Sequence, residues 1–521
     1  GKYIETPNFN RLAKKSVQFN NHYIGSMPCM PARRDMHSGR LSFLHRAWGP
    51  LEPFDNSFPE ILRLNNTYTH LVTDHYHYFE DGGATYHNRF NSWDFIRGQE
   101  SDPWKAMVQP PLEKLREKYH QSQLNLTDRE TGYYHYAINS EFIKEEKDFP
   151  SVKCFASGLE FLQTNKDADN WFLQLETFDP HEPFFAPERF RETIKTNYRG
   201  PRLDWPQYER VTETDEEVAE LKANYIALIA LCDHLLGKVL DHFDENNMWE
   251  DTSLILTTDH GFMLGEHDWW AKNRMPLYNE IANIPFYFYH PEYKQYSGEQ
   301  RNVVTQNIDL MPTFLEMHNL EIPREVQGKS ILKSLSSYSE KNYSIYGYWG
   351  SGINITDGNH TFFWYPDNDE KKSKSSIPSD VSNDQLHVYI VKAMCMNNEK
   401  QEAYGSQSSY HEFLLKVFKG IGAKWKLYKE EQEKEKDILN TSGKSGSSDA
   451  SMIEHDFELS ILIAYIDTVW TKYDTDRNGS ISVDETKQLL SDITGHKSIS
   501  RKECEQFVKS LNDCLLYTSP S

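Results

Sequence analysis

The sequence predicts an α/β fold built on a largely parallel sheet sandwiched by helices, and two observations support this. From residue 1 to about 390, short β-rich runs alternate with longer segments of helical periodicity. Trp171–Glu176 and residues 252–258 are compact apolar runs, and residues 215–243 between them repeat apolar side chains at helical spacing. We therefore expect a strand, a long amphipathic helix and a second strand in this order.

Composition narrows the class of protein. The chain has 521 residues and a net charge of −22, which argues against binding to a phosphate backbone. Hydrophobic residues make up 38% of the chain, too many for a disordered protein, and no stretch approaches the ~20 apolar residues of a membrane span. We expect a soluble globular protein with no nucleic-acid partner and no membrane span in this chain.

The chain divides into four predicted parts. We expect a large α/β domain at residues 1–300 and a smaller α+β subdomain at 301–395. Residues 424–436 carry mixed charge and 440–451 are rich in Ser and Gly, which predicts a linker at 396–451. A helical module follows at 452–513.

Two polar groups follow the two predicted strands. Asp179 and His181 come after the first strand, and Asp259 and His260 come after the second. Open α/β sheets bind ligands beyond the carboxyl ends of their strands. A carboxylate at the end of a strand is what a hard cation prefers, whereas imidazole also suits Zn²⁺ and other transition metals.

The most informative segment is Cys29-Met30-Pro31-Ala32-Arg33, followed by Ser38-Gly39-Arg40. A lone Cys is more often a small buried side chain than a nucleophile, and surface arginines are often only solvated. Here Arg33, Arg34, His37 and Arg40 all follow closely, so an anion near Cys29 would meet cations able to bind it with two hydrogen bonds.

The pattern C-x-P-x-R followed by S-G-R resembles the signature of the type I sulfatases. Further segments are similar to the family and stand in its order: residues 6–13, Thr258-Asp259-His260-Gly261, Gly265-Glu266-His267, residues 278–285, and Asp309-Leu310-Met311-Pro312-Thr313. The resemblance covers about residues 1–390. It implies an alkaline-phosphatase-like fold in which a formylglycine-generating enzyme converts Cys29 to formylglycine.

The resemblance also assigns roles to residues. A hydrated aldehyde at position 29 would attack sulfur with one hydroxyl and expel sulfate through the other, beside Arg33. Asp259 and His260 would hold a divalent metal, Ca²⁺ with Mn²⁺ or Mg²⁺ as alternatives. Lys272 would contact the sulfate group, and His181 would protonate the leaving alcohol.

Two departures from the family pattern matter. Relatives carry a Lys-x-His pair after an early strand, whereas this chain offers His75 and His77 and leaves open which of them is the base. The family's adjacent aspartates, which supply half of the metal site, precede the segment that opens this chain. We therefore expect an N-terminally truncated sulfatase, and we predict that residues 1–521 alone turn over no sulfate ester.

The last module carries a second motif, an EF-hand calcium loop. Its oxygen ligands alternate around Ca²⁺, and Gly479 permits the sharp turn. The predicted ligands are Asp474, Asp476, Asn478, Ser480, Ser482 and Glu485. No second calcium loop follows, so we expect the chain to be cut at this end too. Whether the loop regulates, anchors or stabilises is left open.

The leading hypothesis is a sulfatase that acts on a sulfated small molecule or glycan. A phosphonate monoester or phosphodiester hydrolase of the same superfamily is one alternative, and a non-catalytic, Ca²⁺-dependent protein that binds sulfated glycans is another. The resemblance implies passage through the secretory pathway to an extracellular or lysosomal location.

Overall fold

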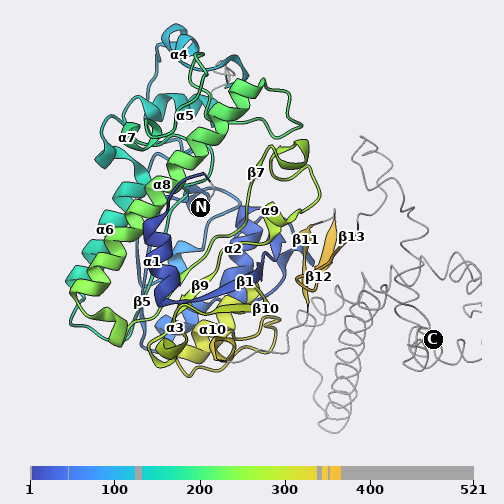
Figure 1. Cartoon of the computed structure of the whole chain (residues 1–521). Helices are drawn as coiled ribbons and strands as arrows, with labels where there is room; N and C mark the ends of the chain where they lie inside the picture. The colour runs from blue at the N-terminus through green and yellow to red at the C-terminus, as the bar shows by residue number, and fades with distance from the viewer. Residues whose placement is uncertain (1–2, 45, 124–131, 337–342, 350–351, 365–521) are drawn as a thin grey trace, which may run out of the picture. The chain divides into compact units, whose positions relative to one another are not determined.

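The computed structural model describes residues 3–44, 46–123, 132–336, 343–349 and 352–364 (Figure 1). Two compact units divide the chain, Gly1–Gly358 and Asn359–Ser521. The first unit contains nearly all of the described residues; in the second, the described part includes strand β13 (Thr361–Trp364). The predicted linker and EF-hand loop lie outside the described residues, so both stay predictions.

Two sheets form the centre of the first unit. One has four strands, in the order β10 (Gln300–Gln306), β1 (Val17–Tyr23), β9 (Tyr287–Tyr289) and β6 (Leu254–Leu256). The other has three parallel strands, in the order β4 (Ser92–Phe95), β3 (Tyr68–Thr73) and β5 (Trp171–Glu176). The expected strand at 171–176 is therefore confirmed, and the second expected strand is present in shortened form as β6.

The prediction of one largely parallel sheet was wrong in detail, because the described strands form separate sheets: the three-stranded sheet is parallel, whereas the four-stranded sheet is mixed. β1 runs parallel to β10, but β9 runs antiparallel to both β1 and β6. Parallel neighbours need a long crossover, usually a helix, whereas the 30 residues between β6 and β9 contain only a hairpin and a one-turn helix. β5 and β6 end their separate sheets, and every residue in both strands is only half-buried.

Helices cover both faces of the three-stranded sheet (Figure 1). Trp171 contacts Phe161 of α6 (Pro150–Thr164), while the next residue, Phe172, contacts Phe58 of α3 (Phe58–Leu64) and Phe314 of α10 (Leu310–Met317). Successive side chains of a strand point to opposite faces, so these helices lie on opposite sides of the sheet. The predicted sandwich of a sheet between helices is thus present.

The long predicted helix is confirmed as α8 (Asp215–Glu245). Thr214 and Glu217 form a capping box at its start, in which the Thr214 hydroxyl accepts from the Glu217 N–H. Its apolar side joins α1 (Pro7–Lys15) and α6 in one core cluster with Leu173 and Leu254.

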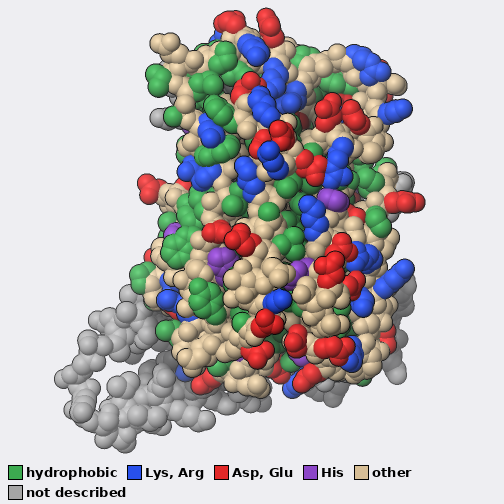
Figure 2. All heavy atoms as spheres, turned by 90° about the vertical axis from the view of Figure 1, so that its left-hand side faces the viewer, with side chains coloured by type: hydrophobic (Ala, Val, Ile, Leu, Met, Phe, Trp, Pro, Cys, Tyr) green, Lys and Arg blue, Asp and Glu red, His purple; other side chains and the backbone are tan. Residues whose placement is uncertain are grey.

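Among the described residues, α8 is the one helix with the length and apolar composition of a membrane span, and 56% of its most apolar window is buried inside the protein. Acidic and basic side chains are interspersed over the face of the molecule on the α6 and α8 side (Figure 2). An amphipathic core helix accounts for both observations.

Shorter elements complete the unit. β2 (Ser26–Met27) runs parallel to β11 (Ser344–Tyr348), which pairs with β12 (Ile353–Thr356). The remaining strands and helices are the hairpin β7 (Met263–Leu264) and β8 (Trp270–Ala271), with α2 (Cys29–Ser38), α4 (Leu112–Lys118), α5 (Gly132–Ser140), α7 (Glu188–Arg191) and α9 (Asn279–Ala282).

Candidate active site

Helix α2 carries the signature, and a buried carboxylate fixes its position. Asp35 accepts hydrogen bonds from the Ser26 N–H at 2.6 Å, the Ser26 hydroxyl at 3.0 Å and the Ser42 N–H at 2.7 Å. A Cβ at Gly25 would lie 2.1 Å from the Asp35 carboxylate, so only glycine fits there. Burial raises the pKa of Asp35 to about 7. This network holds both ends of α2 and therefore places Cys29.

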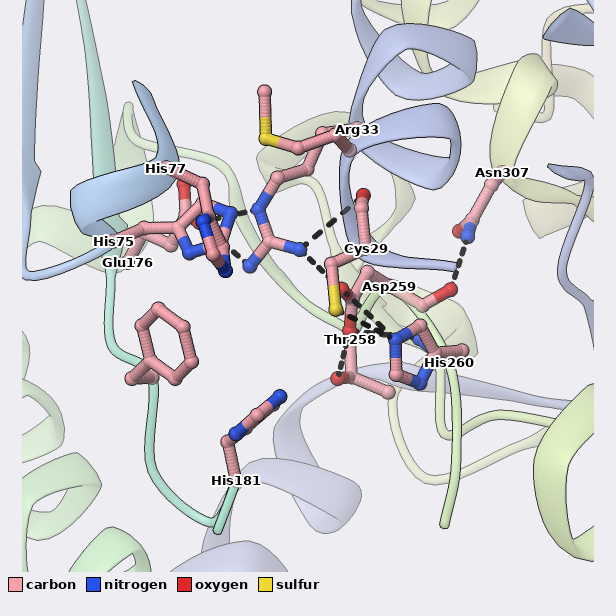
Figure 3. Close-up of polar contacts among 12 residues, drawn as sticks. Cys29, Arg33, His75, His77, Glu176, His181, Thr258, Asp259, His260 and Asn307 are labelled. Carbon is pink, nitrogen blue, oxygen red and sulfur yellow. Dashed lines mark hydrogen bonds and ion pairs between the residues drawn. The ribbon is translucent and has the colours of Figure 1, made fainter. Parts of the chain in front are cut away.

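Cys29 lies at the first turn of α2 and is 4% exposed. Its Sγ is 3.1 Å from His260 Nε2 and 3.4 Å from Lys272 Nζ (Figure 3). Burial raises the pKa of the thiol, although the positive charge of Lys272 opposes this shift. An unmodified Cys29 is therefore mostly protonated and a weak nucleophile at neutral pH.

Arg33, one turn further along α2, joins the carboxyl ends of β5 and β6. Its Nε and one terminal nitrogen each lie 2.8 Å from Glu176 Oε1, and its other terminal nitrogen donates to Asp259 Oδ2 (Figure 3). Burial disfavours the charged form of Asp259, but the charge of Arg33 outweighs it and holds the pKa of Asp259 well below its usual value. Asp259 is therefore an anion.

Asp259, His260 and Cys29 are the group of three in the described residues whose ligand atoms all lie within 4.8 Å of one another. His260 Nδ1–H donates to the Gly261 carbonyl at 2.9 Å, so Nε2 keeps its lone pair and faces Cys29. Burial lowers the pKa of His260 to about 4, which keeps the ring neutral. A carboxylate oxygen, a neutral imidazole and the side chain at 29 are a donor set that fits a divalent metal.

Lys272 and His181 form a pair on the other side of Cys29. Lys272 Nζ donates to His181 Nε2 at 2.8 Å, and His181 Nδ1–H donates to the Glu182 carbonyl at 2.6 Å. Burial and then the charge of Lys272 lower the pKa of His181 well below its usual value. Burial disfavours the charged form of Lys272, but its acidic neighbours, Cys29 and Glu182 first, outweigh burial and raise the pKa of Lys272. The proton of this pair therefore resides on the lysine.

The two candidate histidines after β3 differ in their surroundings. His77 Nδ1 contacts the Glu80 carboxylate, while both ring nitrogens of His75 are buried without a hydrogen-bond partner. Their ring centroids are 5.1 Å apart, and both side chains lie on the Arg33 side of the site (Figure 3). Burial lowers the pKa of each ring; near His75 the charge of Arg33 adds to the effect, whereas Glu80 opposes it at His77.

The structure thus brings the predicted residues of the first unit into one buried cluster. Sequence reasoning missed Glu176, which orients Arg33, and Asn307, whose Nδ2 donates to the Asp259 carbonyl at 2.9 Å. A single charged residue at the end of the apolar run 171–176 was the signal available for Glu176. No local pattern marks Asn307.

The sulfatase family model matches residues 1–320, more than half of the chain, so the chain belongs to the sulfatase family, whose members are sulfuric ester hydrolases. The family generally uses a divalent metal and formylglycine.

Relatives in sequence span several substrates. The multifunctional alkaline phosphatase superfamily protein PehA of Trinickia caryophylli is 23% identical over 74% of this chain and 81% of its own. The arylsulfatase of Clostridium perfringens is 23% identical over 71% of this chain and 82% of its own. The choline-sulfatase of Rhizobium meliloti is 24% identical over 61% of this chain and 64% of its own.

Solved structures share the fold. The phosphonate monoester hydrolase SpPMH of Silicibacter pomeroyi aligns with a TM-score of 0.51 at 20% identity, over 70% of this chain and 83% of that one. The phosphonate monoester hydrolase of Agrobacterium radiobacter aligns with a TM-score of 0.52 at 16% identity, over the same shares of the two chains.

Proposed function

We propose that this protein hydrolyses sulfate monoesters at the cluster around Cys29. The observation that carries the proposal is the contact of Cys29 Sγ with both His260 and Lys272, residues that lie 231 and 243 positions away in sequence. The candidate nucleophile Cys29 thus lies beside both the candidate metal ligand His260 and Lys272, the cation proposed to bind the sulfate group.

The side chain at position 29 and the metal supply the chemistry that the other residues support. Formylglycine at this position would supply a hydrated aldehyde able to act as nucleophile and to release sulfate. Asp259 and His260 would hold the divalent metal, Ca²⁺ with Mn²⁺ or Mg²⁺ as alternatives, which acts as a Lewis acid toward sulfate oxygens. Arg33 keeps Asp259 ionised and adds positive charge on the same side.

The chain's own residues would move the protons. Lys272 binds a sulfate oxygen and is placed to pass its proton through His181 Nε2 to the leaving alcohol. His77 is the better candidate for the base, because Glu80 fixes its Nδ1 and leaves Nε2 as the acceptor. His75, with two free nitrogens, is left to bind substrate oxygens.

An assay on protein purified from its native host tests the proposal. We expect release of sulfate from an aryl sulfate, loss of that release after chelation of divalent metal, and formylglycine in the peptide that contains position 29. An unmodified thiol together with no sulfate release would favour the non-catalytic, glycan-binding alternative. The prediction that residues 1–521 alone are inactive is tested by the same assay on that chain.

A phosphonate monoester or phosphodiester hydrolase is the second candidate. It is favoured by one observation, the likeness of fold to two phosphonate monoester hydrolases. Rates on matched p-nitrophenyl sulfate and phenyl phosphonate esters separate the two. A higher kcat/KM on the phosphonate would make this second candidate the function.

A further inference from the structure

A buried histidine that is linked to the metal-ligand pair has no role in the chemistry above. His22 lies near the end of β1, is 0% exposed, and stands in register with Thr305 of β10. Its ring stacks on Phe286, with the ring centroids 4.2 Å apart. Nδ1 lies 2.9 Å from the Thr305 hydroxyl, and Nε2 lies 3.3 Å from Oδ1 of Asn307. The ring is therefore held in one orientation by β10 and by the residue that follows this strand.

The hydrogen bonds of this histidine lead to Asp259. Asn307 Nδ2 donates to the Asp259 carbonyl at 2.9 Å (Figure 3). A carbonyl oxygen can only accept, so this bond fixes which end of the Asn307 amide is nitrogen and leaves Oδ1 facing His22. Oδ1 also only accepts, so His22 Nε2 carries the proton, and in a neutral ring Nδ1 accepts from the Thr305 hydroxyl. The chain of donors thus runs from β10 through His22 and Asn307 to the Asp259 carbonyl.

The peptide group that this chain reaches joins the two candidate metal ligands. The Asp259 carbonyl belongs to the peptide between Asp259 and His260, and in the described structure neither residue makes a backbone-to-backbone hydrogen bond. β6 ends at Leu256, three residues earlier, and the chain is next held where the Gly261 N–H donates to the Ile281 carbonyl at 2.8 Å. Rotation of the peptide would move the carboxylate and the imidazole together. Asn307 holds the carbonyl of this peptide.

Asn307 in turn depends on His22 for its orientation. An amide turned over would point its oxygen at the Asp259 carbonyl, and two acceptors repel each other. His22 Nε2–H binds Oδ1 and so favours the orientation in which Nδ2 meets the carbonyl. Thr305 is 2% and Asn307 0% exposed, so a partner lost from this network leaves a buried polar atom without a hydrogen bond.

We propose that His22 is a positioning residue, which acts through Asn307 to fix the orientation of Asp259 and His260 as ligands of the divalent metal. This inference rests on the proposed function, which assigns the metal to that pair. His22 itself contacts neither metal ligand through a bond of its ring nitrogens, which are taken by Thr305 and Asn307. Groups that orient metal ligands from behind typically change metal affinity or activity by about 10- to 100-fold.

Metal binding measures this role without turnover. Calorimetry follows the titration of Mn²⁺ into metal-free protein from the native host, with Glu485→Gln in the parent protein and in every variant to remove the predicted calcium loop. His22→Phe keeps the ring stack on Phe286 and loses both nitrogens, so we expect its affinity for Mn²⁺ to fall by about 10- to 100-fold. His22→Gln keeps an N–H donor for Asn307 and should lose less.

His70 supplies the matched control. Its ring also stacks on a phenylalanine, Phe161, and bonds to a hydroxyl, that of Ser92, but it lies on β3 and outside this chain of hydrogen bonds. His70→Phe should leave the affinity for Mn²⁺ unchanged. Rescue by metal is the second readout: excess Mn²⁺ should restore sulfate release by His22→Phe, which a general loss of folded protein would not allow.

The outcomes separate this inference from the proposed function. A parent protein that binds no Mn²⁺, or a His22→Phe variant that binds it as tightly as the parent, overturns the positioning role. If His22→Phe melts below the assay temperature, Thr305→Val takes its place, with a smaller loss of affinity expected and an unchanged affinity overturning the role. Weaker metal binding in the variant, with sulfate released by none of the proteins, overturns the hydrolysis and leaves the positioning role standing.

Discussion

The two sides of the active site are held in different ways. On one side, α2 sits in a buried network in which Asp35 accepts three hydrogen bonds and Arg34 pairs with Asp55 at 2.7 Å. On the other side, β5 and β6 end separate sheets and are half-buried throughout. Backbone pairing does not join these two strands in the described structure, so side chains must align them.

Arg33 provides that alignment. It belongs to the rigid side and binds Glu176 at the end of β5 and Asp259 just after β6. One guanidinium therefore orients both strand ends toward Cys29. Where sheet hydrogen bonds are lacking, the geometry of the site depends on a few charged contacts.

Replacing Arg33 should have the largest effect, because it removes the contacts that align the ends of β5 and β6 with α2. Arg33→Ala leaves the half-buried carboxylates of Glu176 and Asp259 without the cation that pairs with them, which we expect to lower the free energy of unfolding by about 3–5 kcal/mol and to abolish hydrolysis. Urea unfolding and sulfate release measure the two effects. Arg33→Lys, which keeps the charge but not the paired donors, should recover stability more than activity. An unchanged unfolding midpoint in Arg33→Ala would show that the strand ends align without it.

Besides the contacts of Arg33 with Glu176 and Asp259, a third charged contact joins His77 and Glu80 in the loop after β3. Substitutions of the histidines in this loop test it. His77→Gln should lower kcat by about 10²- to 10⁴-fold, the usual contribution of a general base, while His75→Gln should act mainly on KM. Steady-state kinetics of the two variants compare them directly. A larger loss of kcat in His75→Gln would reverse the assignment of the base.

A pair of leucines measures the difference in burial. Leu71 on β3 is 0% exposed, and Leu173 on β5 is half-buried. Leu71→Ala should cost about 2–5 kcal/mol of unfolding free energy, and Leu173→Ala about half as much, because less apolar area leaves water there. Denaturant titrations of both variants give the numbers. Equal costs would mean that β5 is as tightly packed as β3.

The smallest expected effect is the pH dependence due to Asp35. Its folded pKa of about 7 lies above its ordinary value of 3.8, so between these pH values the unfolded chain loses a proton that the folded protein keeps. Stability from this group therefore falls as pH rises through that window. From pH 6 to pH 8 the wild type should lose about 1 kcal/mol more than Asp35→Asn. Parallel stability curves for the two proteins would exclude the effect.

Local patterns in the sequence predicted the elements and the motif residues, but not the contacts between them. The apolar runs and helical spacing located β5 and α8 because local periodicity determines them. β9 pairs antiparallel with β1, and Asn307 bonds to the Asp259 carbonyl. Both contacts join segments that are distant in sequence, so no local pattern predicts them. Glu182 stood inside the segment around His181, yet its free oxygen is visible only in three dimensions.

The burial of Cys29 bears on whether folding or oxidation of its thiol would have to come first. With 4% of the residue exposed, the sulfur is out of reach of a second macromolecule once the chain has folded. Under the proposed function, an enzyme that oxidises this thiol would have to meet it during synthesis, before α2 docks. The fraction of molecules with a modified Cys29 would then depend on the rate of oxidation relative to the rate of folding. Molecules that fold first would keep the thiol.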